Sequence, residues 1–177
     1  MKKMLFSFLA LMFLCTSAYA DGEGADSVIA IKASDIRGGT VSLTDWQHVS
    51  TGQPDAAVLD VVKQAGFTTV VDLRGENENR GMDEASEVEA RGMRYYTLPI
   101  GNGVVEDVSY DNARQLDRIL AAAQGPVLVH CASGNRVGAL FALRAKLAGS
   151  TGDEALALGK AAGLTRLEPV VIQRLQE

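Results

Sequence analysis

Two short apolar stretches constrain the fold of this chain more than any other feature. Residues 67–73, FTTVVDL, and 126–130, PVLVH, are apolar and β-branched without strict polar alternation. This pattern is typical of strands buried on both faces of a sheet. Patterns typical of amphipathic helices lie on either side of these stretches. The alternation predicts an α/β fold with a mostly parallel central sheet flanked by helices.

The same kind of pattern predicts the remaining elements. We expect one more strand at 93–99 and helices at 54–65, 83–91, 109–123, 136–148, 152–162 and 166–176. A capping pattern from Thr165 to Glu168 indicates the start of the last helix. Loops that follow parallel strands meet at one edge of the sheet, where ligands bind. We therefore expect residues 74–81, 101–107 and the loop after residue 130 to come together.

Residues 1–20 have the features of a signal peptide. Lys2 and Lys3 precede an apolar run over 4–14, and the last three residues are Ala18, Tyr19 and Ala20. The run is about half the roughly 20 residues that a membrane span needs. We expect cleavage after Ala20, export to the periplasm or beyond, and no stable membrane insertion of the mature chain.

The mature chain is expected to form one domain behind a tether. Residues 21–40 are rich in Gly, Asp and Ser, which predicts a flexible segment, and residues 41–177 are long enough for one compact core. The formal net charge is −5, although two of the basic residues lie in the signal. Nucleic acid and anionic lipid are therefore poor partners.

Cys131 is the only cysteine that remains after the signal is removed. An exported chain meets an oxidising compartment where cysteines normally pair, yet no intramolecular disulfide can form here. The residue lies at the end of a predicted strand, before a glycine-containing loop and a helix. A lone cysteine is often only a small buried apolar residue, so its neighbours decide between the two interpretations.

The neighbours of Cys131 favour an anion site. Backbone N–H groups at a helix start, together with Arg136, would lower the thiol pKa to roughly 3.5–7.5 and make Cys131 a nucleophile. Gly134 permits positive φ, and Arg136 can hold two oxygens of a phosphate-like anion. The amides proposed to bind that anion belong to Ala132, Ser133, Gly134, Asn135 and Arg136. His130 is expected to orient the cysteine through a backbone hydrogen bond, the alternative being a satisfied core histidine.

These residues resemble a known family. His130 and Cys131 followed by SGNR resemble the signature loop of cysteine-dependent phosphatases. More narrowly, they resemble the bacterial beta-lactamase-hydrolase-like phosphatase domain, a relative of dual-specificity and tyrosine phosphatases. Three stretches carry this resemblance over about residues 48–165: VSTGQPDAAVLDVVKQAGFTTVVDLRG, EARGMRYYTLPIGNG and GPVLVHCASGNR.

The resemblance implies a cysteine-phosphatase-like fold and a phosphomonoesterase activity. Cys131 would attack phosphorus to form a thiophosphate intermediate that water hydrolyses, while Arg136 and the loop amides stabilise the transferring group. The substrate would be a phosphorylated protein or small molecule. No metal or other cofactor is implied.

Three departures from the broader superfamily bear on this mechanism. The spacing is Cys-x4-Arg where most relatives have Cys-x5-Arg, although the bacterial group shares the short form. Val137 replaces the usual Ser or Thr, which predicts slow breakdown of the intermediate. Asn102 occupies the place of the usual general acid, so Glu106 or Asp107 is expected to act instead. The alternative for Asp107 is a cap of the helix that begins near residue 109.

Two further residues are assigned to the pocket. Arg74 follows a strand and resembles an arginine of the family there, and Asn102 lies in the loop after the next strand. The alternative for Arg74 is a structural ion pair with Asp72, Glu76 or Glu78.

Two other functions stay open at this point. A rhodanese-type sulfurtransferase also places a cysteine on a strand-loop-helix corner, but its usual Gly-His-Ile stretch is missing here. A phosphate-binding module that has lost turnover would explain Asn102 and Val137. The phosphatase hypothesis requires that the Cys131 sulfur can be reached by a substrate and that the Arg136 guanidinium faces the loop amides.

Overall fold

A five-stranded parallel sheet forms the centre of the protein, which confirms the predicted α/β fold and adds two strands, β1 and β2, to the three predicted. The computed structural model describes residues 28–101 and 104–177. The strand order is β1-β2-β5-β3-β4, and every neighbouring pair is parallel. The strands are β1 (Val28–Ala30), β2 (His48–Thr51), β3 (Thr69–Asp72), β4 (Arg94–Thr97) and β5 (Val127–His130).

The register of the sheet places polar residues together at its carboxyl edge. β5 is the central strand, and its last residue, His130, pairs with Thr51 of β2 and Asp72 of β3. All three residues are buried. The loops that leave this edge after β2, β3 and β5 therefore start side by side.

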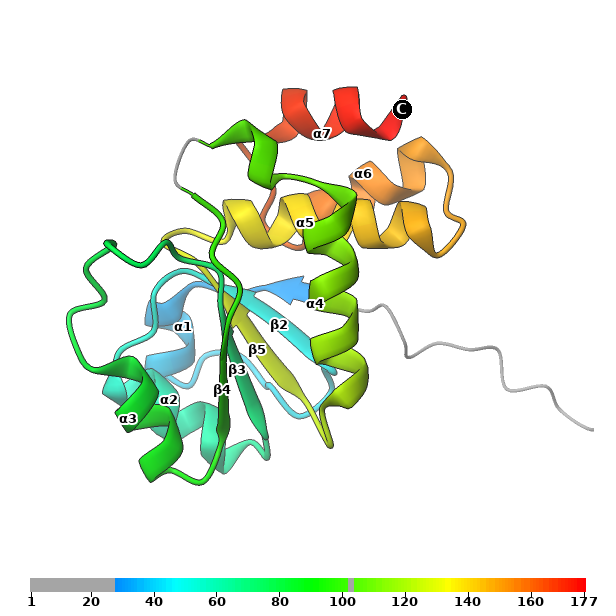
Figure 1. Ribbon diagram of the computed structural model, residues 1–177. Helices are drawn as coiled ribbons and strands as arrows, with labels where there is room; N and C mark the ends of the chain where they lie inside the picture. The colour runs from blue at the N-terminus through cyan, green and yellow to red at the C-terminus, as the bar shows by residue number, and fades with distance from the viewer. Residues whose placement is uncertain (1–27, 102–103) are drawn as a thin grey trace, which may run out of the picture.

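Helices cover both faces of the sheet (Figure 1). One face packs against α1 (Ala33–Arg37), α2 (Ala56–Gln64) and α3 (Glu84–Ala90). The other face packs against α4 (Tyr110–Ala122) and α5 (Asn135–Leu147), and the turn η1 (Val105–Asp107) precedes α4. Two further helices, α6 (Gly152–Ala161) and α7 (Glu168–Leu175), pack on α5 and form a second apolar core with it.

The helix α5 is buried along most of its length because it lies between the sheet and the last two helices. Its close approach to α6 requires glycine at position 138. A Cβ at Gly138 would lie 2.1 Å from the amide nitrogen of Leu164 and 2.5 Å from the carbonyl oxygen of Gly159. This packing fixes the helix whose first turn follows the cysteine loop.

Most predicted elements are confirmed to within a few residues, but the tether prediction is wrong for residues 28–40. This segment contains the edge strand β1, which pairs with β2, and the helix α1, whose Ile36 is fully buried. Elements of three and five residues are too short to show a periodic pattern, which explains the error. The proposed signal peptide, and residues 21–27 of the tether, lie outside the described residues.

The predicted cap at Thr165 is also wrong. The N-cap of α7 is Leu167, which makes no side-chain capping bond. Thr165 instead uses its backbone amide and its hydroxyl to bind Asn135 Oδ1, at 2.8 and 3.1 Å. No helix within residues 28–101 and 104–177 has both the length and the apolar character needed to cross a membrane.

Candidate active site

The loop between β5 and α5 turns the sulfur of Cys131 toward the start of a helix. Cys131 follows the last residue of β5 and donates its amide to the Thr51 carbonyl at 3.4 Å. Gly134 has φ of 83°, a left-handed conformation that glycine adopts without strain. Its N–H donates to Cys131 Sγ at 3.1 Å. The loop therefore directs at least one backbone donor at the sulfur.

The start of α5 carries backbone donors that no side chain caps. The N-caps of α4 and α6 are Ser109 and Thr151, whose hydroxyls each accept an N–H of the first turn. The N-cap of α5 is Gly134, which has no side chain to do so. The first N–H groups of a helix have no partner within it. Asn135 and Arg136, which begin α5, are nonetheless buried. A buried and uncapped helix start favours a bound anion.

Arg136 is held at one end of its guanidinium. Nη1 donates to Glu78 Oε1 at 2.5 Å and to the Ile100 carbonyl at 2.7 Å, and Nη2 donates to Glu78 Oε2 at 2.8 Å. The hydrogen bond with Glu78 raises the pKa of Arg136, and the interaction with Cys131 adds to this rise. The hydrogen bonds to Glu78 and to the Ile100 carbonyl use Nη1 and Nη2 and do not involve Nε. The edge formed by Nε and Nη2 is the side that two phosphate oxygens could take.

Glu78 is the site residue that sequence reasoning missed. Its pKa is lowered to about 2, first because Arg136 donates to it, with further lowering by the amide of Gly75 and by Arg74. The Gly75 amide lies 2.8 Å from Oε1, and Arg74 Nε lies 3.3 Å from Oε2. The sequence had suggested Glu78 only as one partner of Arg74. Its place in a loop expected to meet the cysteine loop was the signal that could have found it.

Arg74 is used inside the protein, as its ion-pair alternative predicted. Its side chain contacts Glu78, donates to the Asn79 carbonyl at 2.7 Å and donates to Gln53 Oε1. Arg74 is also largely buried. The structure therefore places Arg74 behind Glu78 rather than on an open pocket wall.

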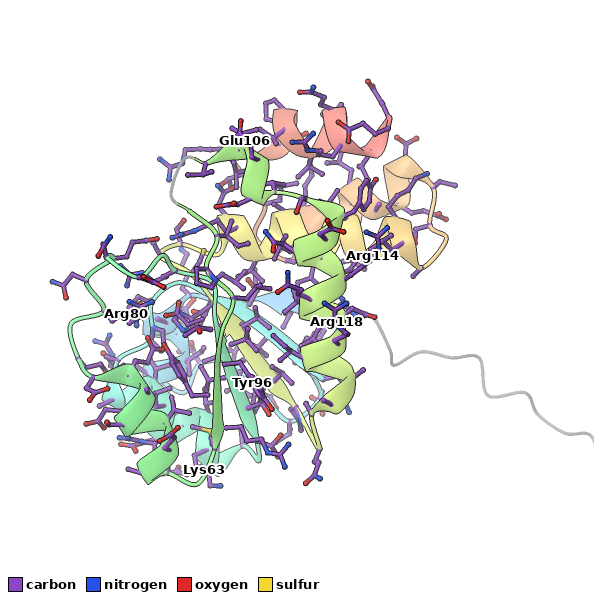
Figure 2. The ribbon with its side chains drawn as sticks, in the orientation of Figure 1. Lys63, Arg80, Tyr96, Glu106, Arg114 and Arg118 are labelled. Atoms are coloured by element: carbon purple, nitrogen blue, oxygen red, sulfur yellow. The ribbon has the colours of Figure 1, made fainter. Side chains whose placement is uncertain are left out.

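His130 contacts carboxylates, so the expected backbone hydrogen bond is wrong. Its Nε2 lies 2.8 Å from Glu84 Oε1 and 3.8 Å from Asp72 Oδ1, and all three side chains are fully buried. Arg80 Nε lies 2.5 Å from Asp72 Oδ2, and Figure 2 shows Arg80 on the long loop after β3. The sequence could not reveal this contact because Glu84 lies 46 positions earlier in the chain.

The same group is the one set among the described residues with spacing suited to a metal ion. Asp72, Glu84 and His130 each offer an atom, and these atoms lie within 4.8 Å of one another. Arg80 and the backbone amide of Arg74 already bind the two oxygens of Asp72. The carboxylate of Asp72 is therefore already bound by the protein, whereas Glu84 Oε1 accepts no hydrogen bond among the described residues.

The remaining predicted loop residues divide between surface and interior. Ala132 and Ser133 are exposed. Asn135 is buried, and its side chain turns away from the sulfur to accept hydrogen bonds from Thr165 and from the Leu167 amide, the latter at 3.2 Å. The side-chain oxygen of Asn135 is therefore used within the protein, and its backbone N–H is the group expected to serve an anion at the loop.

The structure separates the two candidate acids. Asp107 Oδ2 accepts the Gly101 amide at 2.8 Å, and the carbonyl of the preceding residue, Ile100, binds Arg136. Ser109 caps α4, so the capping alternative for Asp107 is wrong. Glu106 is exposed, and Figure 2 shows it on η1 near α7. Asp107 is thus the acid tied to the site, whereas Asn102 lies outside the described residues.

The sulfur is less accessible than the phosphatase hypothesis required. Cys131 is 1% exposed and belongs to the apolar cluster that includes Leu73, Ile100 and Val137. The guanidinium of Arg136 lies near the same sulfur, since Cys131 contributes to the raised pKa of this arginine. Attack by this sulfur on a substrate would therefore require that part of its cover be displaced.

Comparison with known structures identifies the class of fold. The chain resembles Tk-PTP in its active form, with a TM-score of 0.56, 23% identity and coverage of 76% of this chain and 95% of that one. It also resembles a candidate phosphatase from Neisseria meningitidis, with a TM-score of 0.61, 20% identity and coverage of 74% and 95%. P. aeruginosa TpbA, a cysteine-to-serine variant in complex with pTyr, gives a TM-score of 0.54, 22% identity and coverage of 71% and 75%. The fold is that of the cysteine phosphatases.

The sequence then identifies the family. Residues 35–148 match the model of the phosphatase-like domain of beta-lactamase hydrolase-like protein, and the chain belongs to this family. A beta-lactamase hydrolase-like protein of Xylella fastidiosa is 34% identical over 119 residues, and that of Agrobacterium fabrum is 29% identical over 102 residues. These alignments cover 64% and 55% of this chain but only 27% and 23% of the relatives. The match favours the phosphatase hypothesis over the sulfurtransferase.

Proposed function

We propose that the protein is a cysteine-dependent phosphomonoesterase. The thiolate of Cys131 attacks phosphorus, the P–O ester bond breaks, and Asp107 gives a proton to the leaving oxygen. Water then attacks the thiophosphate and passes a proton to Asp107, so that the P–S bond breaks and inorganic phosphate leaves. The α5 amides and the guanidinium of Arg136 stabilise charge on the transferring group.

The observation that carries this proposal is the uncapped start of α5 beside the sulfur. Gly134 directs its N–H at Cys131 Sγ, and Glu78 binds the Nη1 and Nη2 end of the Arg136 guanidinium. These groups supply what phosphoryl transfer asks of a protein, namely positioning and electrostatic stabilisation. Membership of the phosphatase-like family supports the same reaction.

Two features of the site bear on the rate. Val137 is fully buried and packs in the same cluster as Cys131. It offers no hydroxyl to ease departure of the sulfur, so slow breakdown of the thiophosphate stays a prediction. The substrate class is a phosphorylated protein or small molecule, and the signal-like residues 1–20 support a periplasmic location.

The burial of Cys131 favours one alternative, a module that binds phosphate without turnover. Hydrolysis of aryl phosphate by the purified chain, compared with Cys131→Ser, separates the two. The phosphatase proposal expects release of phosphate that the substitution abolishes, and a sulfur-linked phosphate on Cys131 by mass spectrometry. Phosphate binding without hydrolysis would support the module, and thiocyanate formation from thiosulfate and cyanide would support the sulfurtransferase.

A further inference from the structure

A chain of side-chain contacts links the two ends of the cysteine loop. At one end, Arg136 donates to Glu78, and Glu78 also accepts from Arg74 Nε at 3.3 Å. Arg74 then uses Nη1 to donate to Gln53 Oε1. The contacts thus run from α5, across the loop after β3, to the loop after β2.

The remaining contacts of this series lead from Gln53 back to His130, the residue before the nucleophile. Gln53 Nε2 donates to Glu84 Oε2 at 2.9 Å. Glu84 is 1% exposed, and its other oxygen lies 2.8 Å from His130 Nε2. His130 immediately precedes Cys131, so Gln53 connects the Arg136–Glu78 ion pair at one end of the loop with the Glu84–His130 contact at the other.

The chemistry of Gln53 suits this place. A primary amide carries an acceptor and a donor at fixed separation, and Gln53 uses the acceptor for a cation and the donor for an anion. A carboxylate would face Glu84 with like charge, and an apolar side chain would leave both partners without this contact. Gln53 is the one uncharged side chain between Arg136 and Glu84 in the contacts that the described residues make.

We propose that Gln53 is a positioning residue for Arg136. It fixes Arg74, Arg74 fixes Glu78, and Glu78 holds the guanidinium with its side edge toward the anion site. Gln53 acts through these residues and contacts neither the sulfur nor the reacting phosphate. The inference rests on the proposed phosphatase function for its kinetic consequences, whereas its binding consequences need no turnover.

Substitution of Gln53 should therefore weaken the binding of anions at the cysteine loop. In Gln53→Met, Arg74 and Glu78 lose one restraint and the Arg136 guanidinium becomes less well oriented. We expect the affinity for inorganic phosphate and the value of kcat/KM each to fall about tenfold, as coupling between contacting residues allows. Because the guanidinium stabilises charge in the transition state, kcat should fall more than KM rises.

The experiment is a double-mutant cycle on the full chain. Inorganic phosphate binding is measured by calorimetry for the wild type, Gln53→Met, Glu78→Gln and the double variant. Gln115→Met, which changes an exposed glutamine of α4, is the matched control and should leave binding unchanged. Thermal unfolding checks that each variant is folded, and Gln53→Asn, whose shorter amide cannot span both partners, replaces Gln53→Met if that variant unfolds.

The cycle gives a clear decision. The proposal expects the loss caused by Gln53→Met to shrink below about twofold in the Glu78→Gln background, because the path to Arg136 is already broken. An equal loss in both backgrounds, or no loss in the wild-type background, would overturn it. A wild-type chain that binds phosphate but hydrolyses no phosphate ester would contradict the proposed phosphatase function and leave the positioning role of Gln53 intact. A wild-type chain that binds no phosphate would overturn both.

Discussion

Glu78 meets Arg136 end-on, with its two oxygens 2.5 and 2.8 Å from Nη1 and Nη2. The residues are 58 positions apart in the chain, and each is largely buried. The pairing sets the plane of the guanidinium at the start of α5. Glu78 also neutralises the positive charge of Arg136, which would be costly to bury among apolar side chains without a partner.

The pairing predicts a pH-dependent stability. The pKa of Glu78 is lowered from 4.5 to about 2, so its contribution is complete above about pH 4.5 and is lost as the pH falls toward 2. We expect the wild type to exceed Glu78→Gln in free energy of unfolding by about 1–2 kcal/mol near neutral pH. Urea unfolding at several pH values measures this, and a difference that does not shrink in acid would contradict the assignment.

Arg136→Lys should remove most activity while the fold persists. Lysine cannot bind Glu78 with two nitrogens and also offer a planar edge to phosphate. We expect kcat to fall by roughly 10²–10³, the usual cost of losing a donor to the transition state. Arg118→Lys on α4 is the control, and steady-state kinetics with an aryl phosphate provide the measurement. Activity retained in Arg136→Lys would show that the guanidinium is not required.

Asp107→Asn tests the proton donor. Asparagine can still accept the Gly101 amide, so the loop should keep its shape while the acid is lost. We expect hydrolysis of alkyl phosphates, whose leaving groups need a proton, to slow by about 10²–10⁴, and hydrolysis of activated aryl phosphates to slow much less. Glu106→Gln, which changes the exposed residue just before Asp107, should change neither rate. The opposite result would transfer the role to Glu106.

Gly138→Ala tests the packing that supports the loop. An added Cβ would collide with backbone atoms of α6 and of the turn after it, which cannot move aside as a flexible side chain can. We expect a loss of at least about 2 kcal/mol in the free energy of unfolding. Gly152→Ala is the control, because a Cβ there meets nothing within 4 Å. Equal stability of the two variants would mean that α5 and α6 are less tightly packed than the structure shows.

The sequence by itself determined the order of most elements and the corner that holds Cys131. Strands 67–73 and 126–130 are marked by runs of buried residues, and the helices by apolar residues at helical spacing, so local pattern alone predicts them. The pairing of His130 in β5 with Asp72 in β3 depends on the strand order, which the local pattern did not predict. The short elements β1 and α1 were not predicted, because three or five residues are too few to show a periodic pattern.

Only the tertiary structure decided which charged residues meet. Glu78, Glu84 and Gln53 lie in separate loops or helices, and nothing in their local sequence distinguishes them from the neighbouring acids and amides. Their contacts depend on how far each loop reaches after leaving the sheet edge. The same holds for the burial of Cys131, because the side chains that cover it come from segments far apart in the chain. Local pattern fixes elements, whereas ion pairing and solvent access depend on distances between them.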